Sequence, residues 1–160
     1  MSIRVGHGFD AHRLAAGRRF VLAGITVADD FGPLGHSDAD VVAHAICDAL
    51  LGAAALGDLG THFPDSDLRW KDADSMVLLA RCTKLLAASG WGVENIDATI
   101  VVQNPRLSQY LPAMRAEVAR VVQIDVNCVS VKAKTSEGMG YTGDGTGIAA
   151  YAVALIESMR

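Results

Sequence analysis

Asp10 and His12 lie two residues apart in a segment that alternates like a β-strand, and His44 follows in a segment patterned like a helix. Residues two apart on a strand point to the same side of it, so Asp10 and His12 can bind one object together. His44 lies on the polar stripe of the helix and can supply a third ligand. One carboxylate and two imidazoles leave a fourth position open, which is typical of a catalytic zinc site. Manganese or iron also fits such ligands.

Glycines flank both halves of this cluster. Gly6 and Gly8 precede the Asp/His pair, and Gly35 precedes the predicted helix, so the backbone can come close to a ligand there. The plainer alternative is a structural hydrogen bond between the carboxylate and the first imidazole, with the second imidazole on the surface. The placement of the glycines favours the metal site.

Three polar residues, His36, Ser37 and Asp38, come just before the predicted helix. Ser37 with Asp40 three residues later fits a capping box with a shortened acid, so we expect Ser37 to cap the helix. A helix N-terminus suits phosphate, and His36 beside it can donate a hydrogen bond to developing negative charge. The two aspartates would repel phosphate unless they orient a histidine. Asp40, one helical turn from His44, is the better candidate for orienting it.

Residues 132–138 end a predicted strand and enter a glycine-rich turn. They lack the Gly-Lys-Ser/Thr ending of a Walker loop, so they do not form that phosphate cradle. The hydroxyls of Thr135 and Ser136, with the carboxylate of Glu137, can hold a diphosphate and its hard cation, which prefers oxygen ligands. The alternative is an exposed strand edge followed by a flexible loop.

The elements that must position these residues follow from the hydrophobic pattern. Residues 3–9 alternate as a strand, residues 19–27 form a hairpin that turns at Ala23 and Gly24, and a loop with Gly32-Pro33 leads to the first helix. One broad arc of that helix is apolar, with Val41, Val42, Ala45, Ile46, Ala49, Leu50 and Ala53. The opposite, narrower arc carries Asp40, His44 and Asp48.

The rest of the chain predicts two more helices and two more strands. In order, we expect a loop over 57–67, a helix over 75–88 capped by Asp74 or Ser75 and stopped at Gly90, a strand over 96–103, a helix from Pro112 to Val122 and a strand over 128–134. Residues 147–158 fit a helix by alanine content or a buried strand by their continuous apolar run. In the loop, Asp65 or Asp67 can bind sugar-like hydroxyls, as any loop aspartate can.

This order predicts an α+β fold in which helices cover one face of a sheet, within a single domain spanning residues 1–160. The other face of the sheet then needs a cover, and association of subunits is the simplest one.

The composition narrows the class of protein. A formal net charge of −4, without a cluster of Lys or Arg, argues against a nucleic-acid partner, so metal ions must help to bind any phosphorylated substrate. The cysteines, Cys47, Cys82 and Cys128, are isolated and odd in number, which suggests a reducing compartment. No segment resembles a signal peptide or is long enough to span a bilayer, so we expect a cytoplasmic protein without a membrane partner.

Several motifs, taken together, resemble those of the 2-C-methyl-D-erythritol 2,4-cyclodiphosphate synthase family. In the first half of the chain they are Gly6–His12, His36–Asp40, Asp48–Gly60 and Phe63–Asp65. In the second half they are Gln103–Arg106, Lys132–Glu137 and Gly140–Gly143. No single motif would suffice, but the combination covers essentially the whole chain.

The resemblance implies a homotrimer of α+β subunits, each a two-layer sandwich whose mixed sheet packs around the trimer axis, with active sites between neighbours. It also implies a step of the non-mevalonate isoprenoid pathway. In that step, 4-diphosphocytidyl-2-C-methyl-D-erythritol 2-phosphate closes on itself and releases CMP, as a phosphorus–oxygen lyase requires. The attacking 2-phosphate is already anionic, so the enzyme needs no general base; metal ions would offset the repulsion between the phosphates.

Residue roles follow from the same resemblance. Asp10, His12 and His44 would hold zinc or manganese, and Glu137 would hold magnesium or manganese on the diphosphate, while His36 and Thr135 would stabilise the transition state. The methylerythritol part would contact Asp10, His12, His36, Ser37, Asp58, Gly60, Phe63, Asp65 and Asp67. The cytidine diphosphate part would contact Val102, Gln103, Asn104, Pro105, Arg106, Leu107, Ser108, Lys134, Thr135, Ser136, Glu137 and Tyr141.

One position departs from the pattern of the family. Some relatives have an arginine after the residue matching Gly143 and a glutamate two positions later, lining a cavity on the trimer axis that can bind an isoprenoid diphosphate. Here these residues are Asp144 and Thr146, so we do not expect anion binding in that cavity.

Two other functions compete at this stage. The first is a metal-dependent phosphohydrolase that uses zinc-bound hydroxide on a nucleotide diphosphate. The second is a trimeric binding module in which the Asp/His cluster only stabilises the fold.

Overall fold

The computed structural model describes residues 2–159. Its strands are β1 (Ile3–Ala16), β2 (Phe20–Leu22), β3 (Ile25–Ala28), β4 (Phe31–Leu34), β5 (Trp91–Val101), β6 (Val129–Lys134) and β7 (Gly147–Ser158). Its α-helices are α1 (Val41–Ala53), α2 (Leu59–His62), α3 (Ser75–Ala88), α4 (Leu111–Val122) and α5 (Gly140–Gly143), with short 3₁₀ turns at Leu68–Trp70 and Val126–Cys128.

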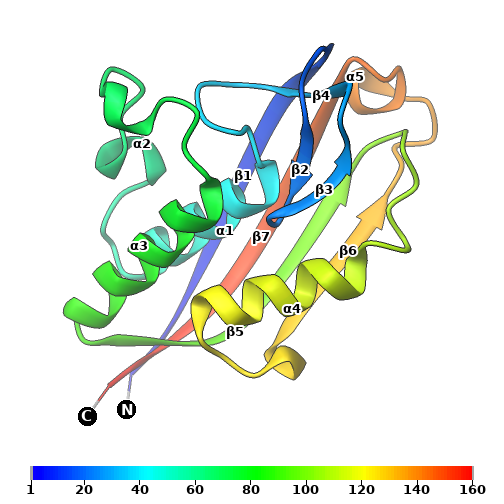
Figure 1. Ribbon diagram of the computed structural model, residues 1–160. Helices are drawn as coiled ribbons and strands as arrows, with labels where there is room; N and C mark the ends of the chain where they lie inside the picture. Colours follow the sequence, from blue (N-terminus) through cyan, green and yellow to red (C-terminus); the bar gives the residue numbers. More distant parts are fainter. Residues whose placement is uncertain (1, 160) are drawn as a thin grey trace.

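A five-stranded mixed sheet carries the fold, in the order β4-β1-β7-β5-β6. The β5–β6 pair is parallel and the other pairs are antiparallel. Helices α1, α3 and α4 lie on one face of this sheet, together with the separate β2–β3 hairpin (Figure 1). The expected α+β architecture, with a mixed sheet and helices on one face, is therefore confirmed.

Small residues let α1 lie directly on the sheet. A Cβ atom added at Gly6 would lie 1.9 Å from the carbonyl oxygen of Ala49, and one at Gly8 would lie 1.8 Å from that of Ala45. Neither position has room for a side chain, so the backbones of β1 and α1 pack against each other. This close contact holds the helix directly over the strand that carries Asp10 and His12.

The N-terminus of α1 is capped by Asp40, and the expectation that Ser37 caps it is wrong. The carboxylate of Asp40 accepts hydrogen bonds from the backbone N–H groups of Val42 and Ala43, both 3.1 Å long. It also accepts from the N–H groups of Ala23 (2.9 Å) and Gly24 (2.8 Å) in the turn of the β2–β3 hairpin. Asp40 therefore joins the hairpin to the helix.

Burial, together with the nearby charge of Asp38, raises the pKa of Asp40 to about 6, although the backbone N–H groups of Gly24, Ala43 and Ala23 act in the opposite direction by favouring the charged form. The oxygens of the Asp40 carboxylate already accept the four hydrogen bonds described above, and the carboxylate makes none to His44. The predicted role of Asp40 in orienting His44 is therefore not what the structure shows.

Other predicted elements are found with adjusted bounds. The ambiguous residues 147–158 form β7, in the middle of the sheet between β1 and β5. The segment around Gly32-Pro33 is not a loop but β4, an edge strand, where a proline without an N–H group is tolerated. The predicted loop over 57–67 contains α2. Helices α3 and α4 and strand β6 lie within a residue of their predicted bounds.

The sheet face opposite the helices is apolar and open. Since Gly6 and Gly8 face α1, the odd-numbered residues of β1 point the other way. On that side Val5 is 65% exposed, Phe9 45% and Tyr151 43%. The rings of Phe9 and Tyr151 contact each other, with centroids 5.1 Å apart. None of the helices within residues 2–159 has the length and apolar character that crossing a bilayer requires.

Candidate metal centre and substrate pockets

Asp10, His12 and His44 converge between β1 and α1, and could together hold a metal ion. One ligand atom from each residue lies within 4.8 Å of the other two. Asp10 Oδ2 is 2.9 Å from His12 Nε2 and 2.9 Å from His44 Nδ1. The alternation of the strand predicted that Asp10 and His12 point to the same side, and both do so, on the side that faces α1.

The donor set fits zinc by an observation on His12. The Nδ1–H group of His12 donates to the carbonyl oxygen of Leu34 over 3.0 Å, because a carbonyl can only accept. With Nδ1 committed to this carbonyl, the buried Nε2 is the ring nitrogen that faces Asp10, and Oδ2 is its near neighbour at 2.9 Å. In the neutral ring this nitrogen carries a lone pair that faces a carboxylate oxygen, an arrangement that a cation shared between the two would stabilise. One carboxylate oxygen and two ring nitrogens match the ligand types of zinc.

Charges within the cluster are strongly coupled. Burial alone would raise the pKa of Asp10, but the adjacent His12 and His44 outweigh it and lower that pKa to about 2. Burial alone would lower the pKa of His44, but the hydrogen bond and charge of Asp10 outweigh it and raise that pKa. Without a metal, His44 therefore holds a proton between its Nδ1 and Asp10, at the place where a metal would bind.

A pocket of about 250 Å³ surrounds the cluster and is lined by Asp10, His12, His36, Ser37, His44, Asp48, Asp58, Leu59, Gly60, Phe63 and Asp65. Every residue expected to bind the methylerythritol part lines it except Asp67. The carboxylate of Asp67 instead binds the guanidinium of Arg69 and caps the 3₁₀ turn that follows. His36 Nε2 is buried without a hydrogen-bond partner.

Sequence reasoning gave no role to Asp48, which also lines this pocket. Its Oδ1 accepts a 2.7 Å hydrogen bond from the N–H group of Leu59, so it ties α1 to α2. Burial raises the pKa of Asp48. The signal was present, because Asp48 lies on the same arc of α1 as His44, one turn further on.

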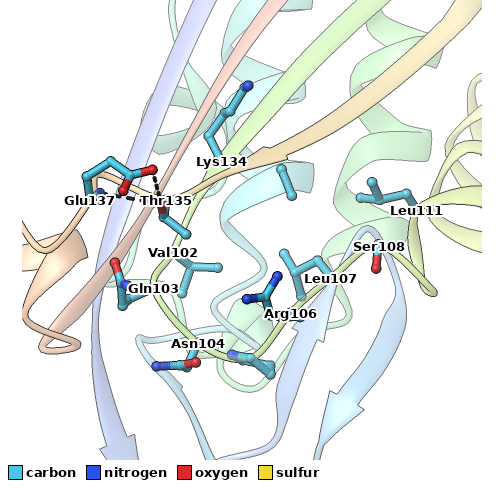
Figure 2. Close-up of a pocket in the computed structure, with 12 residues that line it drawn as sticks. Val102, Gln103, Asn104, Arg106, Leu107, Ser108, Leu111, Lys134, Thr135 and Glu137 are labelled. Atoms are coloured by element: carbon cyan, nitrogen blue, oxygen red, sulfur yellow. Dashed lines mark hydrogen bonds between the residues drawn. The ribbon is translucent and has the colours of Figure 1, made fainter.

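A second pocket of about 490 Å³ lies where β5 and β6 end. It is lined by Val102, Gln103, Asn104, Pro105, Arg106, Leu107, Ser108, Leu111, Ala133, Lys134, Thr135 and Glu137 (Figure 2). Arg106 and Lys134 bring positive charge to it, which suits phosphate. The hydroxyl of Thr135 donates to Glu137 Oε1 over 3.3 Å.

Two residues expected at this pocket do not line it. The hydroxyl of Ser136 lies 2.6 Å from that of Thr142 and donates to the carbonyl oxygen of Met139, so it is turned toward α5. Tyr141 lies beside a smaller hollow that His12 and Arg13 also line. Leu111 and Ala133 line the pocket without having been predicted.

The two pockets lie on different strands of the sheet and share no lining residue. Across the sheet, Asp10 is paired with Ala150, Ala150 with Ile100, and Ile100 with Ala133. Three strand spacings of about 4.8 Å place the backbone of Asp10 about 14 Å from that of Ala133 in β6.

Comparisons with known proteins agree with this geometry. The chain matches the model of the YgbB family over residues 3–157. It is 56% identical over 155 residues to 2-C-methyl-D-erythritol 2,4-cyclodiphosphate synthase of Syntrophomonas wolfei, which covers 97% of this chain and 99% of the relative.

Two solved structures resemble the fold closely. The bifunctional IspDF of Campylobacter jejuni superposes with a TM-score of 0.95 at 36% identity, over 99% of this chain and 43% of that longer chain. A 2C-methyl-D-erythritol-2,4-cyclodiphosphate synthase in its CDP-bound form superposes with a TM-score of 0.88 at 34% identity, over 96% of this chain and 100% of that one.

Proposed function

Since this chain belongs to the YgbB family, we propose that it is the enzyme that makes 2-C-methyl-D-erythritol 2,4-cyclodiphosphate in the non-mevalonate isoprenoid pathway. Its substrate is 4-diphosphocytidyl-2-C-methyl-D-erythritol 2-phosphate, and CMP is the second product. The observation that carries the proposal is the convergence of Asp10, His12 and His44 in one pocket with His36 and Asp58.

The proposed reaction joins two phosphates of one molecule. An oxygen of the 2-phosphate forms a bond to the β-phosphorus, and the bond from that phosphorus to the oxygen bridging to the α-phosphate breaks. The electron pair leaves with CMP, so the enzyme is a phosphorus–oxygen lyase. The 2-phosphate is already ionised at neutral pH, and the difficulty is to align two anions in line rather than to remove a proton.

The side chains of both pockets suit this task. Zinc or manganese held by Asp10, His12 and His44, with magnesium or manganese at Glu137, would supply positive charge that offsets the repulsion between phosphates. The unpaired Nε2 of His36 can donate to a phosphate oxygen in the transition state.

The remaining parts of the substrate have matching surfaces. The hydroxyl of Thr135 can donate a hydrogen bond to the diphosphate from the pocket that we assign to the nucleotide. Asp58, Gly60, Phe63 and Asp65 bind the methylerythritol hydroxyls and methyl group, whereas Asp67 is paired with Arg69 and does not line this pocket. The cytidine diphosphate occupies the 490 Å³ pocket, a proposal that the CDP-bound relative supports.

The active enzyme is a homotrimer in this proposal. One substrate must reach both pockets, yet about 14 Å of sheet separates them within a chain. The open apolar face around Phe9 and Tyr151 supplies a surface for packing sheets around an axis. Each active site then joins the metal pocket of one single-domain subunit to the nucleotide pocket of its neighbour. The free cysteines of the chain suit the reducing cytoplasm, where we place the enzyme.

Incubation of the zinc- and magnesium-loaded protein with the cytidyl substrate tests the proposal. We expect CMP and the cyclic diphosphate in equal amounts by ³¹P NMR. Release of orthophosphate, or of an uncyclised diphosphate, would contradict it and indicate a hydrolase. No turnover by a fully metal-loaded trimer would indicate a metal-stabilised binding module.

A further inference from the structure

We propose that Asp38 and Ser75 are positioning residues that hold His44 with a proton on Nε2, so that Nδ1 presents its lone pair to the metal. The inference rests on the metal-dependent function proposed above. It replaces the role expected for Asp40, whose carboxylate binds four backbone N–H groups elsewhere.

The two ring nitrogens of His44 face different partners. Nδ1 lies 2.9 Å from Asp10 Oδ2, on the side of the metal cluster. Nε2 lies 2.9 Å from the hydroxyl oxygen of Ser75, the first residue of α3. Ser75 is fully buried and His44 is 9% exposed, so water does not compete for this contact.

The direction of the hydrogen bonds is set by Asp38. Its carboxylate accepts from the backbone N–H group of Ser75 over 3.0 Å, and from the hydroxyl of the same residue. A carboxylate only accepts, so the hydroxyl proton of Ser75 is committed to Asp38. The Ser75 oxygen is then left to accept, and the ring of His44 must donate to it from Nε2.

Ser37 is a second contact of the same nitrogen. Its hydroxyl oxygen lies 3.1 Å from His44 Nε2 and accepts a hydrogen bond from the N–H group of Ala39. Unlike Ser75, it has no carboxylate to take its proton. Ser37 therefore tolerates either state of Nε2, whereas the Asp38–Ser75 pair selects one.

In His12, too, the position of the ring proton is fixed by a hydrogen bond, in this case to a single backbone carbonyl. The carbonyl oxygen of Leu34 holds the proton on its Nδ1 and leaves Nε2 for the metal. The two histidines thus bind through different nitrogens, and each has its far nitrogen fixed by an acceptor. Such partners of metal-binding histidines orient the ring and raise its basicity.

Two variants and one control test the inference. We expect Ser75→Ala and Asp38→Asn each to weaken zinc binding about 10- to 100-fold, measured by competition with a chelating dye. In the zinc-loaded wild type, ¹H–¹⁵N NMR should show a slowly exchanging Nε2–H on His44 that Ser75→Ala loses. The control Asp74→Ala removes the neighbouring cap of α3, a 2.8 Å bond from the N–H group of Met76, without touching His44. It should keep zinc affinity within about twofold, so a loss confined to the first two variants is not a general effect on α3.

Zinc affinity unchanged in both folded variants, or a zinc-loaded wild type without a proton on Nε2 of His44, would overturn the inference. These outcomes are independent of product formation. A wild-type protein that binds zinc in the expected way but makes no cyclic diphosphate would contradict the proposed function and leave the role of Ser75 intact.

Discussion

At the scale of single residues, the cluster of Asp10, His12 and His44, which could hold a metal ion, is also a proton-binding site. Asp10 raises the pKa of His44 above its ordinary value of 6.5, so the metal-free protein keeps a proton on His44 at pH values where a free imidazole has lost it. Asp10 itself, with a pKa of about 2, stays ionised throughout the neutral range. Metal binding must therefore release a proton from His44.

We expect zinc affinity to fall as the pH drops through the raised pKa of His44. Below that pKa each zinc ion displaces one proton from this residue, so the apparent affinity should fall at least about tenfold per pH unit. Zinc titrations between about pH 5 and pH 8 would measure this dependence. An affinity that is constant over this range would contradict the coupling between Asp10 and His44.

The sequence predicted that Asp10, His12 and His44 come together, but it did not predict their supporting contacts. Asp10 and His12 were found by strand alternation, and His44 by its place on a helix arc, which are local patterns. The contact between His44 and Ser75 joins residues 31 positions apart, and no local pattern encodes it. The role of Asp40 was predicted wrongly because its carboxylate, one helical turn from His44, can also reach the first N–H groups of α1 and those of the β2–β3 turn.

At the scale of elements, the packing of α1 on β1 decides whether the site forms. We expect Gly8→Ala to lower the free energy of unfolding by about 3 kcal/mol, because the new Cβ would overlap the carbonyl of Ala45. Pushing α1 off the strand should also move His44 away from Asp10 and weaken zinc binding. Denaturant unfolding and zinc titration would measure the two effects.

Gly52 provides the matched control for this substitution. It lies in α1 itself, and an added Cβ there meets nothing within 4 Å. Gly52→Ala should therefore leave stability unchanged or raise it by up to about 1 kcal/mol through helix propensity. Equal losses from both substitutions would show that the close approach of α1 to β1 is not what matters.

Asp40 is the second element-level determinant, because it joins the β2–β3 turn to α1. We expect Asp40→Ala to lower the free energy of unfolding by about 3 kcal/mol, through the lost cap and the buried N–H groups of Ala23 and Gly24 left without an acceptor. Denaturant unfolding measures this loss, with Asp74→Ala as a control that removes a helix cap alone. A loss no larger than that of the control would contradict the bridging role.

Most elements could be predicted from local signals, and the exceptions have physical causes. The capping and stop residues of α3 and the proline of α4 fix those helices within the sequence itself. Residues 147–158 were ambiguous because alanine favours a helix in isolation, while the neighbours β1 and β5 make the segment a strand. Its alanines serve the fold differently, by leaving room for α1 on the sheet.

At the scale of the whole molecule, the separation of the two pockets makes the assembly testable. In a trimer with shared sites, mixing equal amounts of unfolded His44→Ala and Glu137→Ala chains and refolding them should restore activity. Each variant alone should be inactive, because it lacks one half of every site. Random assembly leaves about a quarter of the sites with both halves intact, so the mixture should reach about a quarter of wild-type turnover.

If both halves of a site came from the same chain, the mixture would stay as inactive as its parents. Light scattering on each variant, and on the mixture, would verify that all of them assemble to the same size. The sequence suggested that another subunit covers the open sheet face, but its local patterns could not show how far apart the two pockets lie within one chain. That distance depends on the order of the strands once the sheet is built.

The two sides of strand β1 carry residues with unrelated roles. Its even-numbered positions hold Asp10 and His12 under α1, and its odd-numbered positions, among them Val5 and Phe9, form the open apolar face. A slip of one residue against β7 would exchange these sides completely. In a misregistered chain Asp10 and His12 would therefore point away from α1, and Val5 and Phe9 would leave the open apolar face at the same time. In the proposed trimer, a single register error would thus remove both the metal ligands and the surface through which the subunit packs.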